Sequence, residues 1–197
     1  YSNNTTEART AAGATEDLYA WGSDGFSVGV GGGAYVQVNE SSAPMVSWNW
    51  KGDGVSGGTL NEVGTIDSQV NVNTTAGFSI VTYTGNGTAD ATVGHGLGVV
   101  PELIIQKSLD QSDQNWIVGS SVLDSTIPWE KYMKLNTTMA AADSDFAWND
   151  TPPSATIFTM KDDDANNKSA GTYVTYCFAS IEGYSKVGGY TGNGADD

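Results

Sequence analysis

Two blocks of this sequence are repeated along the chain. Residues 77–87 (GFSIVTYTGNG) match residues 183–194 (GYSKVGGYTGNG) with one inserted glycine, and the ending Tyr-Thr-Gly-Asn-Gly is unchanged. Residues 39–50 match residues 167–178 in the spacing of their polar, β-branched and aromatic positions. Recurring blocks of this kind indicate a chain built from similar structural units, so the repeat predicts module boundaries before any single element is assigned.

The repeats divide the chain into one whole module and parts of two others. A complete β-sandwich module is expected over 77–182. Residues 1–50 are interpreted as the back half of a preceding module, and residues 183–197 as the opening strand of a following one. Residues 51–76 are rich in Gly, Ser, Asn and Thr, and they are expected to connect modules, with one strand near 70–72. An incomplete module leaves strand edges that need a partner.

Short runs with period-two alternation indicate that the fold is all-β. Gly contributes 25 residues and charged residues only 16%, and turn signals separate the runs, which is typical of a sandwich or barrel. The runs predicted as strands are 45–50, 78–84, 103–105, 116–118, 132–135, 157–160 and 173–178. Alternation predicts that one face of the last run points into a core, and the repeat extends this to the first run. The side chains expected to point inward are Val174, Tyr176 and Phe178, with Val46, Trp48 and Trp50 in the earlier copy.

Charge and residue counts argue against several classes of function. The formal net charge is −15, with 8 Lys and Arg against 23 Asp and Glu, which disfavours nucleic acid and anionic membrane surfaces as partners. One Cys and one His argue against an internal disulfide, Cys-based zinc clusters and multi-histidine metal sites. No apolar run is long enough to suggest a spanning helix. No signal peptide is visible after Tyr1, and the sequence is expected to be a processed product or an excerpt of a longer chain.

Several motifs resemble a repeat module of tailed-phage structural proteins, a type abundant in marine phages and found in tail-fibre-like and other virion proteins. The motifs are residues 77–87, 93–98 (VGHGLG) and 101–107 (PELIIQK), then 173–185 (YVTYCFASIEGYS) and its earlier copy 46–51 (VSWNWK). They are strand and turn motifs, so they identify a module type and no active site. With the strand pattern, the resemblance predicts antiparallel, jelly-roll-like β-sandwich modules in tandem.

The function expected from this resemblance is that of a non-enzymatic structural component of a virion, an extracellular particle. The favoured place is a tail fibre or another tail-associated position, with self-association and other virion proteins as partners. Residues 184–191 are expected to act as a strand donated to a neighbour. A module that binds host-surface glycan is the alternative, and capsid decoration, a head fibre or a glycan-degrading enzyme are less favoured. No cofactor, nucleic acid or membrane insertion is expected.

Two acidic segments are candidates for calcium binding, because calcium takes six to eight oxygen ligands from such loops. Their carboxylates are Asp110 and Asp113 in the first segment, and Asp162, Asp163 and Asp164 in the second. Neither segment has the EF-hand spacing, so a solvated hairpin tip is the competing interpretation.

The remaining candidates have weaker signals, and no catalytic residue is assigned. Trp148, beside Asn and Asp, is the candidate for an exposed sugar-binding aromatic residue. Asp124 and Glu130 are possible partners in glycoside cleavage but have no sequence signature. His95 lies between two glycines, which favours a turn in which the ring closes a hydrogen bond over a role as base or metal ligand.

Overall fold

The computed structural model describes residues 18–22, 25–29, 39, 41–42 and 44–194. The chain divides into two compact units, of which one is Arg9–Trp50 and the other contains Lys51–Asp197. In the smaller unit, β1 (Leu18–Trp21) and β2 (Phe26–Val28) form an antiparallel hairpin. The amide of Gly22 donates a 2.8 Å hydrogen bond to the carbonyl of Gly25, which closes the connection between the two strands.

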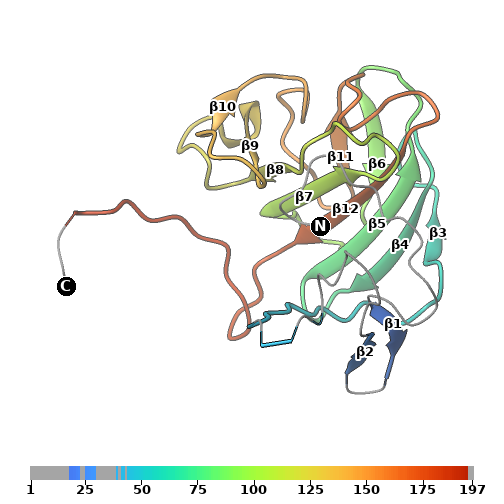
Figure 1. Cartoon of the computed structure of the whole chain (residues 1–197). Coiled ribbons are helices and arrows are strands. Elements are labelled where there is room, and N and C mark those ends of the chain that lie inside the picture. The colour runs from blue at the N-terminus through green and yellow to red at the C-terminus, as the bar shows by residue number, and fades with distance from the viewer. Residues whose placement is uncertain (1–17, 23–24, 30–38, 40, 43, 195–197) are drawn as a thin grey trace. The chain divides into compact units, whose positions relative to one another are not determined.

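An antiparallel sheet of eight strands dominates the larger unit (Figure 1). Its strand order is β10-β9-β8-β7-β12-β5-β4-β3. In chain order the strands are β3 (Thr59–Asn61), β4 (Ser68–Asn73), β5 (Phe78–Thr84), β7 (Leu103–Ser108), β8 (Ile117–Ser120), β9 (Lys131–Lys134), β10 (Ala142–Asp143) and β12 (Thr172–Phe178). The central strand β12 is the last in sequence and inserts between β5 and β7, so the sheet is complete only when its C-terminal strand is in place.

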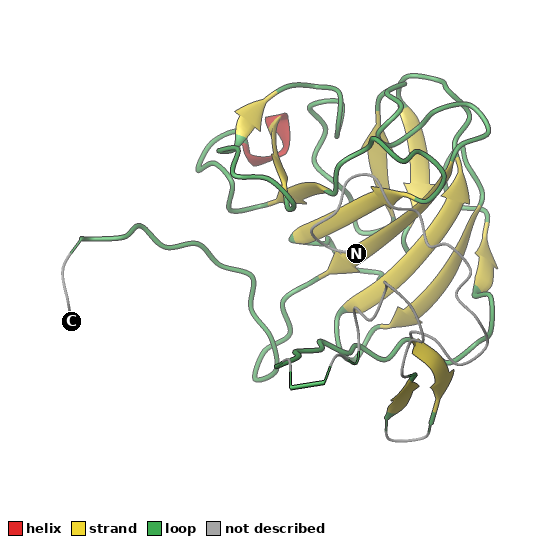
Figure 2. Ribbon diagram, in the orientation of Figure 1, coloured by secondary structure: helices red, strands yellow, loops and turns green. Residues whose placement is uncertain are grey.

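A second layer covers one face of this sheet. It contains the antiparallel pair β6 (Ala91–Gly94) and β11 (Ile157–Met160) and the 3₁₀ helix η1 (Pro128–Glu130), shown with the strands in Figure 2. Side chains of the two layers share one core, where the rings of Tyr83 and Phe158 meet edge-on at 6.3 Å. The prediction of an all-β, antiparallel sandwich is confirmed.

The described residues contain no helix long and apolar enough to cross a membrane.

Register shows which side of β12 faces the core. Tyr173, Thr175 and Cys177 are fully buried, and they lie opposite Tyr83, Val81 and Ser79 of β5. The face predicted to point inward is therefore the outer face of the sheet, where Val174 is buried but Tyr176 and Phe178 are only partly buried. Both faces of this central strand carry residues that can be buried, Tyr173 and Cys177 on one face and Val174, Tyr176 and Phe178 on the other, so alternation identifies the strand but cannot choose its inner side.

The prediction that the matching earlier segment faces a core was also wrong for the chain by itself. Val46 and Trp48 are 71% and 72% exposed, and Trp50 is exposed as well. Residues 44–50 belong to no strand of the described structure.

The predicted connection and the predicted C-terminal strand also differ from the structure. Residues 51–76 contribute β3 and β4, and β4 is paired with β5 over its whole length, so the sheet begins well before residue 77. Ile66, Ser68 and Val70 are buried although the segment is largely polar, because only one face of β4 needs apolar or hydrogen-bonded side chains. Beyond a bridge between Ile181 and Ser185, residues 186–194 form no strand.

Candidate functional site

An open groove of about 760 Å³ crosses the ends of β3, β4, β5 and β12. Leu60, Gln69 and Thr82 lie opposite one another on successive strands, and Thr84 lies opposite Thr172. They belong to the face that does not carry the core. The lining residues are Leu60, Ile66, Asp67, Ser68, Gln69, Thr82, Tyr83, Thr84, Leu109, Thr172 and Tyr173.

The groove lining combines hydroxyl and amide groups with two exposed leucines, Leu60 and Leu109. Thr84, Thr172 and Gln69 are exposed to solvent, whereas the aromatic residues of the lining, Tyr83 and Tyr173, are buried. Asp67 is the one carboxylate in the lining. Such a surface can exchange hydrogen bonds with a polar ligand, but it lacks the paired carboxylates that glycoside hydrolysis uses.

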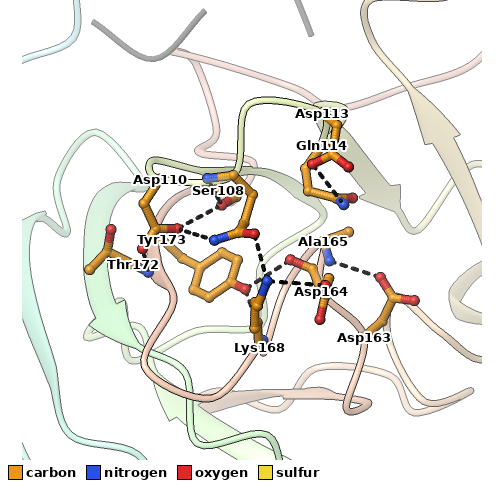
Figure 3. Close-up of polar contacts among 11 residues, drawn as sticks. Ser108, Asp110, Asp113, Gln114, Asp163, Asp164, Ala165, Lys168, Thr172 and Tyr173 are labelled. Atoms are coloured by element: carbon orange, nitrogen blue, oxygen red, sulfur yellow. Dashed lines mark hydrogen bonds and ion pairs between the residues drawn. The ribbon is translucent and has the colours of Figure 1, made fainter. Parts of the chain in front are cut away.

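Two loops meet beside this groove, one after β7 and one before β12 (Figure 3). The ammonium of Lys168 donates a 2.8 Å hydrogen bond to Gln111 Oε1 and lies 3.4 Å from Asp164 Oδ2. The amide of Thr172 donates a 2.9 Å bond to Asp110 Oδ2. The cluster thus fixes the start of β12 against the end of β7, next to the groove.

Hydrogen bonds set the ionisation of Asp110. Burial alone would raise the pKa of this carboxyl. The bonds donated by Gln111, Thr172 and Ser108 oppose burial, and together they lower the pKa below its ordinary value. Asp110 therefore acts as an anionic acceptor that holds backbone and side-chain donors.

The structure brings the two predicted calcium loops together, and the group that joins them is the ammonium of Lys168. Asp163 accepts a 2.8 Å bond from the amide of Ala165, and Asp113 a 3.4 Å bond from the side chain of Gln114. Asp162 is exposed. Within the described ranges, no group of three or more His, Cys, Asp or Glu side chains is placed to hold a metal ion. The calcium hypothesis thus gains no support from this geometry.

His95 is buried and does not line the groove. Its Nε2 is 3.2 Å from the carbonyl of Ser154, and its Nδ1 accepts a 3.3 Å bond from the amide of Leu97. A neutral ring with its proton on Nε2 satisfies both contacts. Burial lowers the pKa of the imidazole, and the bond to Ser154 opposes this only in part. The ring closes a turn, as its flanking glycines predicted.

The whole chain, residues 1–197, matches one family model, described as "Domain of unknown function (DUF7483)". The chain belongs to the DUF7483 family. No curated protein and no solved structure matches it.

Trp148 of this DUF7483 chain is a core residue and not the exposed aromatic residue that its polar neighbours suggested. It is 1% exposed, and its ring meets that of Trp129 edge-on at 5.8 Å. Asn149 and Asp150, which follow it, have positive φ angles of 51° and 49°. Their polarity reflects a tight turn, because Asn and Asp tolerate the left-handed region.

The two other acidic candidates of the DUF7483 chain are not arranged as an acid and base pair in the groove. Asp124 Oδ1 accepts bonds from the amides of Thr126 and Ile127 and from the Thr126 hydroxyl. These bonds lower the pKa of Asp124 and fix the turn before η1. Glu130 belongs to η1. Neither residue lines the groove.

The sequence did not predict the groove. Its polar residues come from β4, β5 and β12 and from the residue just before β4, and in the sequence they look like ordinary strand and turn positions. The one weak signal for the groove was the alternation of threonine in residues 82–84. It indicates that this side of the strand faces solvent, but it does not indicate which strands are its neighbours.

Proposed function

We propose that this chain is a non-enzymatic structural component of a phage virion, placed in a tail fibre or elsewhere on the tail, and that it assembles through its β modules. The observation that carries the proposal is the exposure of strand-like apolar segments outside the sheet. Val46 and Trp48 in one segment, and Tyr184 and Tyr190 in the other, are all more than half exposed. We infer that these segments are covered by a partner in the assembled protein, since large exposed apolar surface marks interaction sites.

The chemistry of the acidic side chains supports a structural function. Asp110, Asp124 and Asp163 each accept hydrogen bonds from backbone amides of their own or adjoining loops. Carboxylates used in this way shape turns and are poorly available as general acids or bases. The resemblance to repeat modules of virion proteins agrees with this use of the residues.

Purified phage particles test the proposal. Mass spectrometry of particles should detect this chain at a stoichiometry like that of other structural proteins, and immunogold labelling should place it on the tail. Labelling confined to the capsid would favour capsid decoration or a head fibre instead. Absence from particles that contain the other virion proteins would overturn the proposal.

Recognition of host-surface glycan is the second candidate function, and the groove favours it. Gln69, Thr82 and Thr172 are grouped across three paired strands, and sugars are bound through such hydroxyl and amide groups. A glycan array should then give binding that the double variant Gln69→Ala, Thr82→Ala abolishes. Turnover of host polysaccharide by the wild-type chain would indicate an enzyme in place of either function.

A further inference from the structure

The same five residues, Tyr-Thr-Gly-Asn-Gly, occur twice in this chain in two different settings. The first copy is residues 83–87, and the second is residues 190–194. The copies contain the two Asn-Gly steps of the sequence, Asn86-Gly87 and Asn193-Gly194. Because the local sequence is the same, a difference in the reactivity of the two steps has to come from their surroundings.

An Asn-Gly step can react with itself. The backbone nitrogen of the glycine attacks the side-chain carbonyl carbon of the asparagine, and glycine favours this attack because it has no Cβ and because its backbone samples more conformations than that of any other residue. A bond forms between the glycine nitrogen and asparagine Cγ, the Cγ–Nδ2 bond breaks, and the glycine amide proton leaves, through solvent, with the departing ammonia. Water then opens the resulting succinimide ring at either carbonyl, which yields aspartate or isoaspartate.

Hydrogen bonds with Asn167 hold the first step in place. The attacking group, the amide of Gly87, donates a 2.9 Å bond to the backbone carbonyl of Asn167. Asn86 Oδ1 accepts bonds of 2.9 Å from the Thr88 amide and 3.2 Å from Asn167 Nδ2. The amide of Asn86 donates a further 2.9 Å bond to Asn167 Oδ1, and Asn167 is 0% exposed. The attacking nitrogen and the carbonyl that it must reach are both held, so these bonds have to break before reaction.

The second step lies outside the sheet. Residues 188–194 are exposed and belong to no strand. A Cβ atom added at Gly192 or Gly194 would meet nothing within 4 Å, so the space around this step is open. Solvent exposure does not distinguish the two steps, because Asn86 and Gly87 are exposed as well. They differ because the first step belongs to the turn that follows β5, which is bonded to the loop before β12.

We propose that Asn193-Gly194 is a site of spontaneous deamidation, and that the folded sheet protects Asn86-Gly87 from the same reaction. Water is the only co-reactant. The products add a negative charge and, in isoaspartate, lengthen the backbone by a methylene group. At Asn193 these changes fall outside the sheet, so the modified chain stays folded, whereas at Asn86 they would disrupt the bonds to Asn167. The inference concerns a covalent modification and does not depend on the proposed function.

Incubation of the full-length chain in neutral buffer at physiological temperature tests the proposal. Trypsin cuts after Lys186 and releases residues 187–197, in which Asn193 is the only asparagine. Mass spectrometry measures the gain in mass as the amide becomes a carboxyl group, and protein isoaspartyl methyltransferase detects the isoaspartate. Fragmentation of the tryptic peptide 52–107 gives the same measurement for Asn86, and a sample digested before incubation corrects for reaction during digestion. Asn193 should react about tenfold faster than Asn86 or more, because Asn86 reacts only in the locally opened population.

Denaturant provides the matched control for the fold. In urea the two steps have the same neighbours and no sheet, so their rates should become similar. Gly194→Ala should slow the loss of Asn193 several-fold, because its Cβ hinders the attacking nitrogen. Gly192→Ala lies on the other side of Asn193 and should leave the rate unchanged. Circular dichroism of each variant, and of the chain after incubation, verifies that the sheet is intact.

Three outcomes would overturn the inference. The first is equal reaction of Asn86 and Asn193 in the folded chain, which would show that the sheet gives no protection. The second is reaction of Asn193 in urea but not in the folded chain. The third is an unchanged rate in Gly194→Ala, which would exclude attack by the glycine nitrogen. None of these bears on whether the chain is found in purified particles, so the proposed function is tested separately.

Discussion

The hydroxyl of Tyr83 donates a 2.6 Å hydrogen bond to the backbone carbonyl of Asn166 inside the core. The same hydroxyl accepts a 2.6 Å bond from the side chain of Gln106, which also donates to Thr175 at 3.1 Å. Burial, with the nearby Tyr173, raises the pKa of the Tyr83 phenol well above its ordinary value, so it stays a donor. The network joins β5, β7 and β12 to the loop that shapes the start of β12.

Removal of this hydroxyl should weaken the fold. Tyr83→Phe leaves the buried carbonyl of Asn166 without its donor, and an unsatisfied buried polar group costs about 1–3 kcal/mol. Urea unfolding should show a loss in this range. Tyr184→Phe, at an exposed position, is the matched control and should unfold like the wild type. Equal stability of the two variants would contradict the assigned role of the network.

Close packing at Gly119 gives a second prediction. A Cβ atom there would lie 2.5 Å from Trp148 Cε2 and 2.7 Å from Trp129 Cζ3, and both rings are buried. Gly119→Ala should therefore destabilise the protein by about 1–3 kcal/mol through overpacking. Gly192→Ala, where a Cβ meets nothing within 4 Å, should leave the melting temperature nearly unchanged. Tryptophan fluorescence would show whether the Trp129–Trp148 contact rearranges.

Stability should fall on acidification because His95 is buried as a neutral ring. Burial lowers the pKa of His95 below its ordinary value of 6.5, so the unfolded chain binds the proton more readily than the folded one. The contribution is fully present above pH 6.5 and is lost as the pH falls below it, with a slope of at most about 1.4 kcal/mol per pH unit.

The chain contains no other histidine, so His95→Gln isolates this effect. The variant should flatten the dependence of the unfolding free energy on pH between about 5 and 6.5, where a histidine titrates. The slope is the readout, whatever the variant does to absolute stability. A wild-type slope that persists in the variant would assign the titration elsewhere.

Asp110 should contribute to stability as an anion. Since its pKa is lowered in the folded chain, its contribution is present above the ordinary pKa and is lost as the pH falls through the lowered value. Asp110→Ala removes the acceptor of the Thr172 amide and should cost about 1 kcal/mol at neutral pH, a typical net value for a hydrogen bond. Asp113→Ala, which removes one 3.4 Å hydrogen bond and an electrostatic interaction with Lys107, is the control. Chemical denaturation at pH 7 and pH 3 measures both, and equal losses would contradict the assignment.

Strand positions were largely predictable from sequence. Residues 78–84, 157–160 and 173–178 coincide closely with β5, β11 and β12, because β-branched and aromatic residues alternate there between clear turn signals. β4 was predicted only near residues 70–72, since its exposed face is polar and its core face includes the small Ser68. The candidate groove was not predictable, because β3 and β12, which both line it, lie far apart in the sequence.

By itself, the sequence determined the all-β class, most strands and the internal repeat, since these follow from local alternation, turn residues and direct comparison of segments. Which face of β12 points into the core was decided only by the tertiary structure. An alternating strand pattern is compatible with either face pointing inward, and the layer of β6, β11 and η1 covers only one of them. The tertiary structure also decided that Trp148 is buried against Trp129 and that Lys168 joins the two acidic loops. Those contacts depend on pairing between strands that are far apart in the sequence, and local sequence patterns do not predict which strands become neighbours.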